Sequence, residues 1–256
     1  MYKKYSYGTV ICSEREIDFL KIQFNSLKAF VNLDDLEILV NTSLPNISFP
    51  FQTNRIIYQK QLKTSCFKTG VGSTEAGHDC ANRLDMLVRE AKGEWVILTH
   101  SDMVWKSSII NGINTFSQFN NIGIIDIWRW GMTVVSKEFY ELSPFGFYGI
   151  ANLSTFREYN GQLRIIPPSG PFSDKCEQDK KEATLGLDMG ELLEIDCFNK
   201  DYKHVVFPDS NKYYHHVGEQ SFSWQNDNLA EDEKRARISE LNQRRDSFFN
   251  EYWRFK

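Results

Sequence analysis

Three consecutive residues near the middle of the chain combine side chains that bind divalent cations with a position at the end of a strand. His100, Ser101 and Asp102 directly follow the apolar run 95–98. His100 and Asp102 are two positions apart, so in an extended segment they lie on one face, and both can coordinate a metal ion. Because open α/β sheets place ligand chemistry where their strands end, we expect the active site here. The alternative is a simple polar turn after a strand.

A second metal ligand should come from a distant segment, because the end of one strand rarely surrounds an ion. The adjacent residues His215 and His216 are the best source. Neighbouring residues on a strand point to opposite faces, so at most one of them can reach the metal. In the alternative interpretation, one histidine packs under Tyr213 or Tyr214 and the other faces water.

Alternating strands and helices in the first half of the chain must position these residues. Strand-like apolar runs cover 7–12, 36–40, 55–58, 95–98 and 122–127, and helical spacing covers 17–31 and 80–91. Gly93 is the expected stop of the second helix. This alternation predicts an α/β protein with a doubly wound, mainly parallel central sheet and helices on both faces.

The second half of the chain is less regular. Residues 143–175 are predicted to be loops, and a helical pattern over 185–198 precedes a strand-like run at 204–207. Near the end, one helical stripe carries Ile238, Leu241, Phe248, Tyr252 and Phe255. We expect this C-terminal helix to dock on the domain. Contact with a membrane surface or with a second copy of the chain is the alternative.

Composition favours a single globular enzyme. The chain has 256 residues, 41% hydrophobic and 25% charged, which is ordinary for a soluble domain with a buried core. A net charge of −4 gives no reason to expect unspecific binding of nucleic acid. The five cysteines lack C-x-x-C spacing and indicate free thiols in a reducing compartment. Since no apolar run has the length of a membrane span or the position of a signal peptide, we expect a cytoplasmic location.

The order of helix, glycine, apolar strand and x-x-Asp resembles the metal-binding segment of nucleotide-sugar-dependent glycosyltransferases of the GT-A fold, particularly family-2-like members. In that family the segment is usually Asp-x-Asp, whereas here His100 takes the first position and Asp102 the second. The resemblance implies that Asp102 is a catalytic metal ligand for Mn²⁺ or Mg²⁺, which stabilises charge on the departing diphosphate. It implies that His100 is a ligand or a hydrogen-bonding partner of phosphate.

The same resemblance favours His216 over His215. Similar enzymes often bring a C-terminal histidine back to the cation or diphosphate, commonly in the pattern His-x-Gly-x-x-Ser. His216, Gly218 and Ser221 match that pattern.

The donor nucleotide is expected at the ends of the first two strands. Ser13 and Glu14 follow the first strand and Asn41 ends the second; in similar enzymes these loops bind the base and ribose. Capping alone also explains Ser13, and Asn41 is equally typical of a turn. Asn82 and Arg83 resemble the family's Asn/Arg pair that faces the donor, although Arg83 could instead be a solvated helix charge.

The acceptor half offers a base and two aromatic platforms. Asp188 is a lone acidic residue early in an apolar helical pattern, where similar enzymes often carry the general base that deprotonates the acceptor hydroxyl. The helix dipole alone would also favour an acid there. Trp128 and Trp130 are candidate sugar-stacking residues, one of which should belong to the core because alternation separates them.

The sequence therefore predicts one GT-A-like domain over residues 1–256. Its donor-binding half covers about 1–131, its acceptor half about 132–228 and its C-terminal helix about 229–256. The expected activity is transfer of a sugar from a nucleoside diphosphate donor to a carbohydrate or other hydroxyl acceptor. The alternatives are a catalytically inactive sugar- or nucleotide-binding relative, suggested by the missing first acid, and a nucleotidyltransferase. The latter should carry a glycine-rich basic loop after the first strand, and residues 12–15 do not form one.

Overall fold

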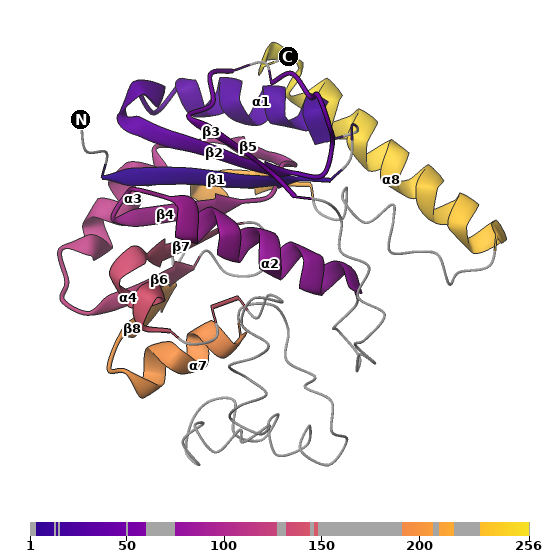
Figure 1. Cartoon of the computed structure of the whole chain (residues 1–256). Helices are drawn as coiled ribbons and strands as arrows, with labels where there is room; N and C mark the ends of the chain where they lie inside the picture. The colour runs from indigo at the N-terminus through magenta and orange to yellow at the C-terminus, as the bar shows by residue number, and fades with distance from the viewer. Residues whose placement is uncertain are drawn as a thin grey trace.

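The computed structural model of the chain contains a mixed β-sheet with helices on both faces (Figure 1). The residues that it describes are 4–12, 14, 16–49, 51–59, 75–126, 132–143, 146–147, 191–206, 210–217 and 231–255. The predicted α/β class with a mainly parallel central sheet is confirmed.

The described strands of the main sheet are arranged in the order β3-β2-β1-β4-β7-β6-β8. Their bounds are β1 Tyr5–Ile11, β2 Leu36–Thr42, β3 Arg55–Tyr58, β4 Trp95–Thr99, β6 Ile122–Asp126, β7 Met132–Ser136 and β8 Lys203–Val206. Strands β3, β2, β1 and β4 run parallel, and β7 is antiparallel to both β4 and β6. All but β7 correspond to the strand-like runs of the sequence.

Apolar residues of the sheet pack against helices on each face. The described helices are α1 Glu16–Lys28, α2 Glu75–Glu90, α3 Ile109–Ser117, α4 Lys137–Leu142, α7 Glu191–Asn199 and α8 Glu231–Glu251, with 3₁₀ turns η1 Leu33–Asp35, η4 Ser210–Lys212 and η6 Trp253–Phe255. One buried cluster joins the sheet to α1 and α3, and a second joins it to α2, α4 and α7. Because both faces are covered, every residue of β2 is buried.

A close approach at the start of β4 fixes this strand against β1. Gly93 precedes β4, and a Cβ atom there would lie 2.6 Å from the backbone nitrogen of Ser6. The Gly93 N–H donates to Ser6 Oγ at 2.9 Å, and the Ser6 hydroxyl donates to the buried carboxylate of Glu37. Only glycine allows this contact, which sets where β4 begins and therefore where it ends.

A separate two-stranded ribbon lies beyond the end of β4. Strand β5, Met103–Trp105, pairs antiparallel with β9, Tyr214–His216, so that Met103 lies opposite His216. No strand-like run in the sequence predicts β5, and a strand near β9 is assumed only in the argument that His215 and His216 face opposite ways. Three-residue strands carry no usable periodicity, and their partners are distant in the sequence.

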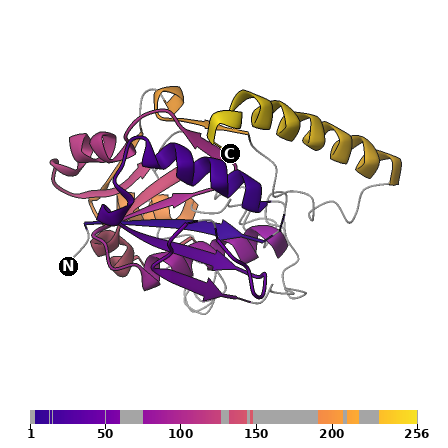
Figure 2. The same ribbon diagram turned by 90° about the horizontal axis from the view of Figure 1, so that it is seen from above.

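Helix α8 packs on the outside of α1. Phe248 of α8 and Tyr252, which directly follows that helix, form a buried cluster with Phe19 and Ile22 of α1 and with Val104. The C-terminal end of α8 lies over α1, while its N-terminal end extends away from the sheet (Figure 2). The predicted apolar stripe is therefore buried at Leu241, Phe248 and Tyr252, whereas Ile238 is 43% exposed.

Among the described residues, no helix is both long enough and apolar enough to cross a membrane.

Candidate active site

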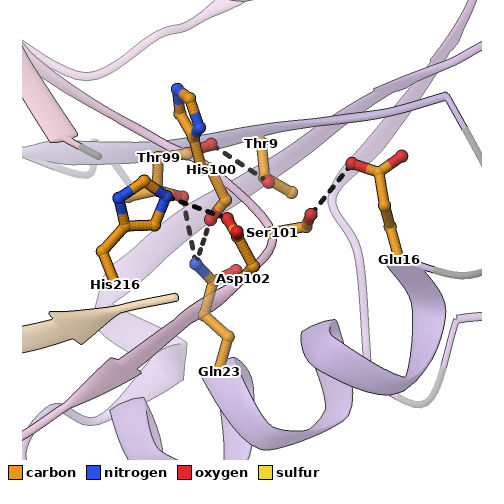
Figure 3. A network of polar contacts seen from close by, with 8 residues as sticks. All are labelled: Thr9, Glu16, Gln23, Thr99, His100, Ser101, Asp102 and His216. Carbon is orange, nitrogen blue, oxygen red and sulfur yellow. Dashed lines mark hydrogen bonds and ion pairs between the residues drawn. The ribbon is translucent and has the colours of Figure 1, made fainter. Parts of the chain in front are cut away.

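The ends of two strands bring His100, Asp102 and His216 together. His100 and Asp102 follow β4, and β9 returns beside β5 with His216 at its end. The Val217 N–H donates to the carbonyl oxygen of Asp102 at 3.1 Å, which holds the two segments in register. One potential ligand atom from each of the three side chains lies within 4.8 Å of the other two (Figure 3).

The carboxylate of Asp102 is the centre of this group. Asp102 is only 2% exposed, and its Oδ1 lies 3.0 Å from Nε2 of His216. Its Oδ2 is buried and has no hydrogen-bond partner among the described residues. Neighbouring ligands on an ion with bonds of about 2.1 Å lie about 3 Å apart in octahedral geometry. The spacing of the His216 and Asp102 atoms therefore suits a shared cation, and Asp102 still has an oxygen to offer.

The protonation states of the cluster also suit a metal. Burial, assisted by the charge of nearby His216 and opposed by that of Asp102, lowers the pKa of His100 to about 4. Burial alone would raise the pKa of Asp102, but the hydrogen bond with His216 and the charges of both histidines bring that pKa below its usual value. At neutral pH His100 is uncharged and Asp102 is ionised, and these are the forms that coordinate cations.

Two residues of α1 support the loop that carries the ligands. Ser101 Oγ donates to Glu16 Oε1 at 2.9 Å (Figure 3). The Cys12 N–H donates to Glu16 Oε2 at 2.8 Å. Gln23 Nε2 donates to the carbonyl oxygen of His100. Both α1 side chains are buried, so the loop after β4 is tied to the loop after β1 through Glu16. Glu16 is not among the predicted site residues, because an acid in the first turn of a helix is already explained by capping.

The two adjacent histidines point in opposite directions. His215 Nδ1 lies 2.7 Å from the Tyr252 hydroxyl, and its ring packs edge-on against the rings of Tyr252 and of Phe248 in α8. His216 instead faces Asp102 and meets the His100 ring edge-on, with centroids 5.1 Å apart. Strand alternation thus directs His216 toward Asp102 and His215 toward the C-terminal helix.

The predicted donor residues Asn41 and Arg83 form a second polar cluster. Arg83 is fully buried, so it is not a solvated helix charge. Its Nη1 donates to Asn41 Oδ1 at 2.8 Å and its Nη2 donates to the Gln59 carbonyl oxygen at 3.0 Å. Asn41 Nδ2 donates to Gln59 Oε1 at 2.9 Å. These bonds link the ends of β2 and β3 to α2, with buried Asn82 adjacent in sequence.

The remaining predicted site residues divide into exposed and undescribed ones. Glu14 is exposed beside the end of β1. The others lie outside the part of the chain that the structure describes, and they are Ser13, Trp128, Trp130, Asp188, Gly218 and Ser221.

Comparison with known proteins yields similarities of structure. No protein-family model and no curated protein sequence matches the chain. The mannosyltransferase PcManGT from Pyrobaculum calidifontis, solved with GDP-Man and Mn²⁺, matches 87% of this chain and 61% of its own at 13% identity and a TM-score of 0.47. TarS 1-349 from S. aureus matches 95% and 72% at 12% identity and a TM-score of 0.44.

Mouse xyloside xylosyltransferase 1, in its apo form, matches 79% of this chain and 84% of its own at 10% identity and a TM-score of 0.42. The chain thus spans 61% of the length of the mannosyltransferase that it resembles. At identities and TM-scores this low, the similarity concerns the backbone fold alone. The chemistry of the site therefore has to be argued from the side chains of this chain.

Proposed function

We propose that the protein transfers a sugar from a nucleoside diphosphate donor to a hydroxyl acceptor with a divalent cation, Mn²⁺ or Mg²⁺, held by His100, Asp102 and His216. The observation that carries this proposal is the Asp102 carboxylate, which is buried and ionised with one oxygen lacking a partner in the described residues. Leaving such a group unsatisfied costs about 1–3 kcal/mol or more. A cation bound at Oδ2 would remove that cost.

The chemistry of sugar transfer explains why a metal cluster belongs at this edge of the sheet. Cleavage of the bond between sugar and diphosphate leaves negative charge on the departing group, and a bound cation supplies compensating positive charge. The residues themselves hold the ligands in place: Gln23 fixes the His100 backbone and Glu16 fixes Ser101. Because these hydrogen bonds already fix the loop, the site needs little reorganisation when negative charge develops on the departing diphosphate.

The remaining roles of the proposal come from the sequence. Ser13, Glu14 and Asn82 would contact the nucleotide, while Asn41 and Arg83 would shape the edge of its site through their hydrogen bonds to each other and to Gln59. Asp188 would take the proton from the acceptor hydroxyl, and Asp188→Asn should then lower the rate by about 10²- to 10⁴-fold.

The test combines ligand-induced stabilisation with turnover. We expect a panel of nucleoside diphosphates and their sugars, screened with Mn²⁺, to contain donors that raise the melting temperature, because such ligands bind only the folded state. Hydrolysis or transfer of the same donor should require the metal. Asp102→Asn should remove the metal-dependent shift, whereas Asp18→Asn, on the exposed side of α1, should keep it.

The possible results separate the proposal from its rival. A shift that survives Asp102→Ala unchanged would remove Asp102 from the metal site. Tight donor binding without turnover of any sugar nucleotide would favour the inactive binding relative, which the histidine at position 100 in place of the usual acid also suggests.

A further inference from the structure

We infer that the metal cluster of His100, Asp102 and His216 selects first-row transition-metal ions over Mg²⁺. The inference rests on the proposed function only for the presence of a cation at this site. Its basis is the set of ligand atoms that the fold brings together, which are two imidazole nitrogens and one carboxylate.

The ligand types disfavour Mg²⁺. Mg²⁺ is a hard cation that is usually bound by carboxylates, phosphates and retained water. Imidazole suits the transition metals, whose affinity for a given nitrogen and oxygen site increases from Mn²⁺ toward Cu²⁺. Both histidines lie next to the one carboxylate, so a cation here gains most of its protein ligands as nitrogen.

The charge of the cluster also favours transition-metal ions over Mg²⁺. With His100 in the first position, the group holds a single formal negative charge, on Asp102. Hard cations are bound largely through charge, and the loss of a carboxylate removes attraction that Mg²⁺ needs. A transition-metal ion depends less on ligand charge because it bonds well to neutral nitrogen.

The cluster is also held in place on both sides. The His100 carbonyl oxygen accepts a hydrogen bond from Gln23, and the pairing of β5 with β9 places His216 opposite Met103. His216 Nε2 already lies at 3.0 Å from Asp102 Oδ1. A site whose ligands are fixed discriminates between ions through ligand type and geometry.

The experiment measures metal affinity of the full chain without any sugar nucleotide. After removal of bound metal with a chelator, Mg²⁺, Mn²⁺, Co²⁺ and Zn²⁺ are titrated by calorimetry or by competition with a fluorescent chelator. We expect each transition-metal ion to bind at least about 10²-fold more tightly than Mg²⁺. Bound Co²⁺ should give visible absorption bands that reflect nitrogen ligation.

Two variants sharpen the measurement. His100→Asp restores a second carboxylate and should lower the ratio of Mn²⁺ to Mg²⁺ affinity by about tenfold or more. His215→Asn is the matched control, because His215 faces α8 and should leave the ratio unchanged. Melting temperatures of the metal-free variants establish that each is folded.

Each outcome of these titrations either supports or overturns the inference of metal selectivity. Equal affinity for Mg²⁺ and Mn²⁺, or an unchanged ratio in His100→Asp, would overturn the inference. Absence of binding by every ion would overturn it too, and metal-independent turnover of a donor would then leave sugar transfer standing. Selective metal binding with no turnover would support the inference and contradict the proposed function.

Discussion

Two polar clusters lie where the parallel strands end, and they differ in how far their groups are satisfied. The arginine cluster, made of Asn41, Gln59 and Arg83, joins its members through three hydrogen bonds of 2.8–3.0 Å. The metal cluster, made of His100, Asp102 and His216, has one such contact, at 3.0 Å, and a buried carboxylate oxygen without a partner in the described chain.

We attribute this difference to a structural role of the arginine cluster and to the ligand binding proposed for the metal cluster. A buried polar group that finds its partners within the protein rigidifies the fold, and removal of one member leaves the others unpaired. A buried group left unsatisfied costs stability and is retained where it binds something else. Substitutions in the two clusters should therefore affect different quantities.

The largest effect is expected from Asp102→Asn in the metal cluster. The amide keeps the shape of the side chain but loses the charge that holds a cation. Metal affinity should be lost and turnover should fall by more than about 10²-fold. The free energy of unfolding without metal should fall modestly, because the lowered pKa of Asp102 shows that the folded state favours its ionised form. Calorimetric metal titration and urea unfolding measure the two quantities, and metal affinity close to that of the wild type would contradict the assignment.

Arg83→Met should give the opposite pattern. Removal of the Arg83 guanidinium leaves Asn41 Oδ1 and the Gln59 carbonyl oxygen without the hydrogen bonds that it donates. We therefore expect the free energy of unfolding to fall by about 3 kcal/mol. Metal affinity of the folded protein should stay within about twofold.

The control for this substitution is Arg55→Met. Arg55 forms an ion pair with Glu90 at the surface, where its side chain is 49% exposed. Such a pair contributes about 0–1 kcal/mol. If both variants lost the same stability, the arginine cluster would not be the structural element that its hydrogen bonds indicate.

The sequence predicted most element types of the first half, β5 and α3 excepted, because their signals are local. Continuous apolar runs identified β1, β2, β3 and β4, and helical spacing identified α1 and α2. The position of Asp102 followed directly, since it depends only on where β4 ends.

The sequence could not predict contacts that depend on distant pairing. The orientation of His216 follows from the register of β9 on β5, and a shift of one residue would turn His215 toward Asp102 instead. The burial of Arg83 depends on the ends of β2 and β3, which a helical pattern alone does not reveal. The bond between Glu16 and Ser101 joins two loops whose approach is set by the pairing of β1 with β4.

Glu16→Gln should have an intermediate effect on the metal cluster. Glu16 touches no ligand directly but accepts hydrogen bonds from Ser101 and from the Cys12 N–H. Partners of this kind typically change metal affinity by about 10- to 100-fold when they are substituted. Asp18→Asn, at an exposed acid of the same helix, is the control.

A double-mutant cycle with Ser101→Ala tests whether Glu16 acts through the loop. If it does, the double variant should lose little more metal affinity than either single variant. Fully additive losses would mean that Glu16 acts on the cluster by another route.

The smallest effect is the response of stability to acid, and it too distinguishes the clusters, since the arginine cluster contains no histidine and no carboxylate. Burial lowers the pKa of His100 to about 4, whereas the unfolded value is 6.5. Between these two pH values this histidine binds a proton in the unfolded chain but not in the folded protein. Metal-free stability should therefore fall as the pH is lowered through this window, by at most about 1.4 kcal/mol per pH unit for one proton. The lowered pKa of Asp102 acts only below 3.8, where the stabilising ionised form is lost.

Burial also lowers the pKa of His215, so His215→Asn is measured beside His100→Asn. Urea unfolding at pH 7 and pH 5 should show a smaller loss for His100→Asn than for the wild type, and an identical loss would place the acid response outside the metal cluster.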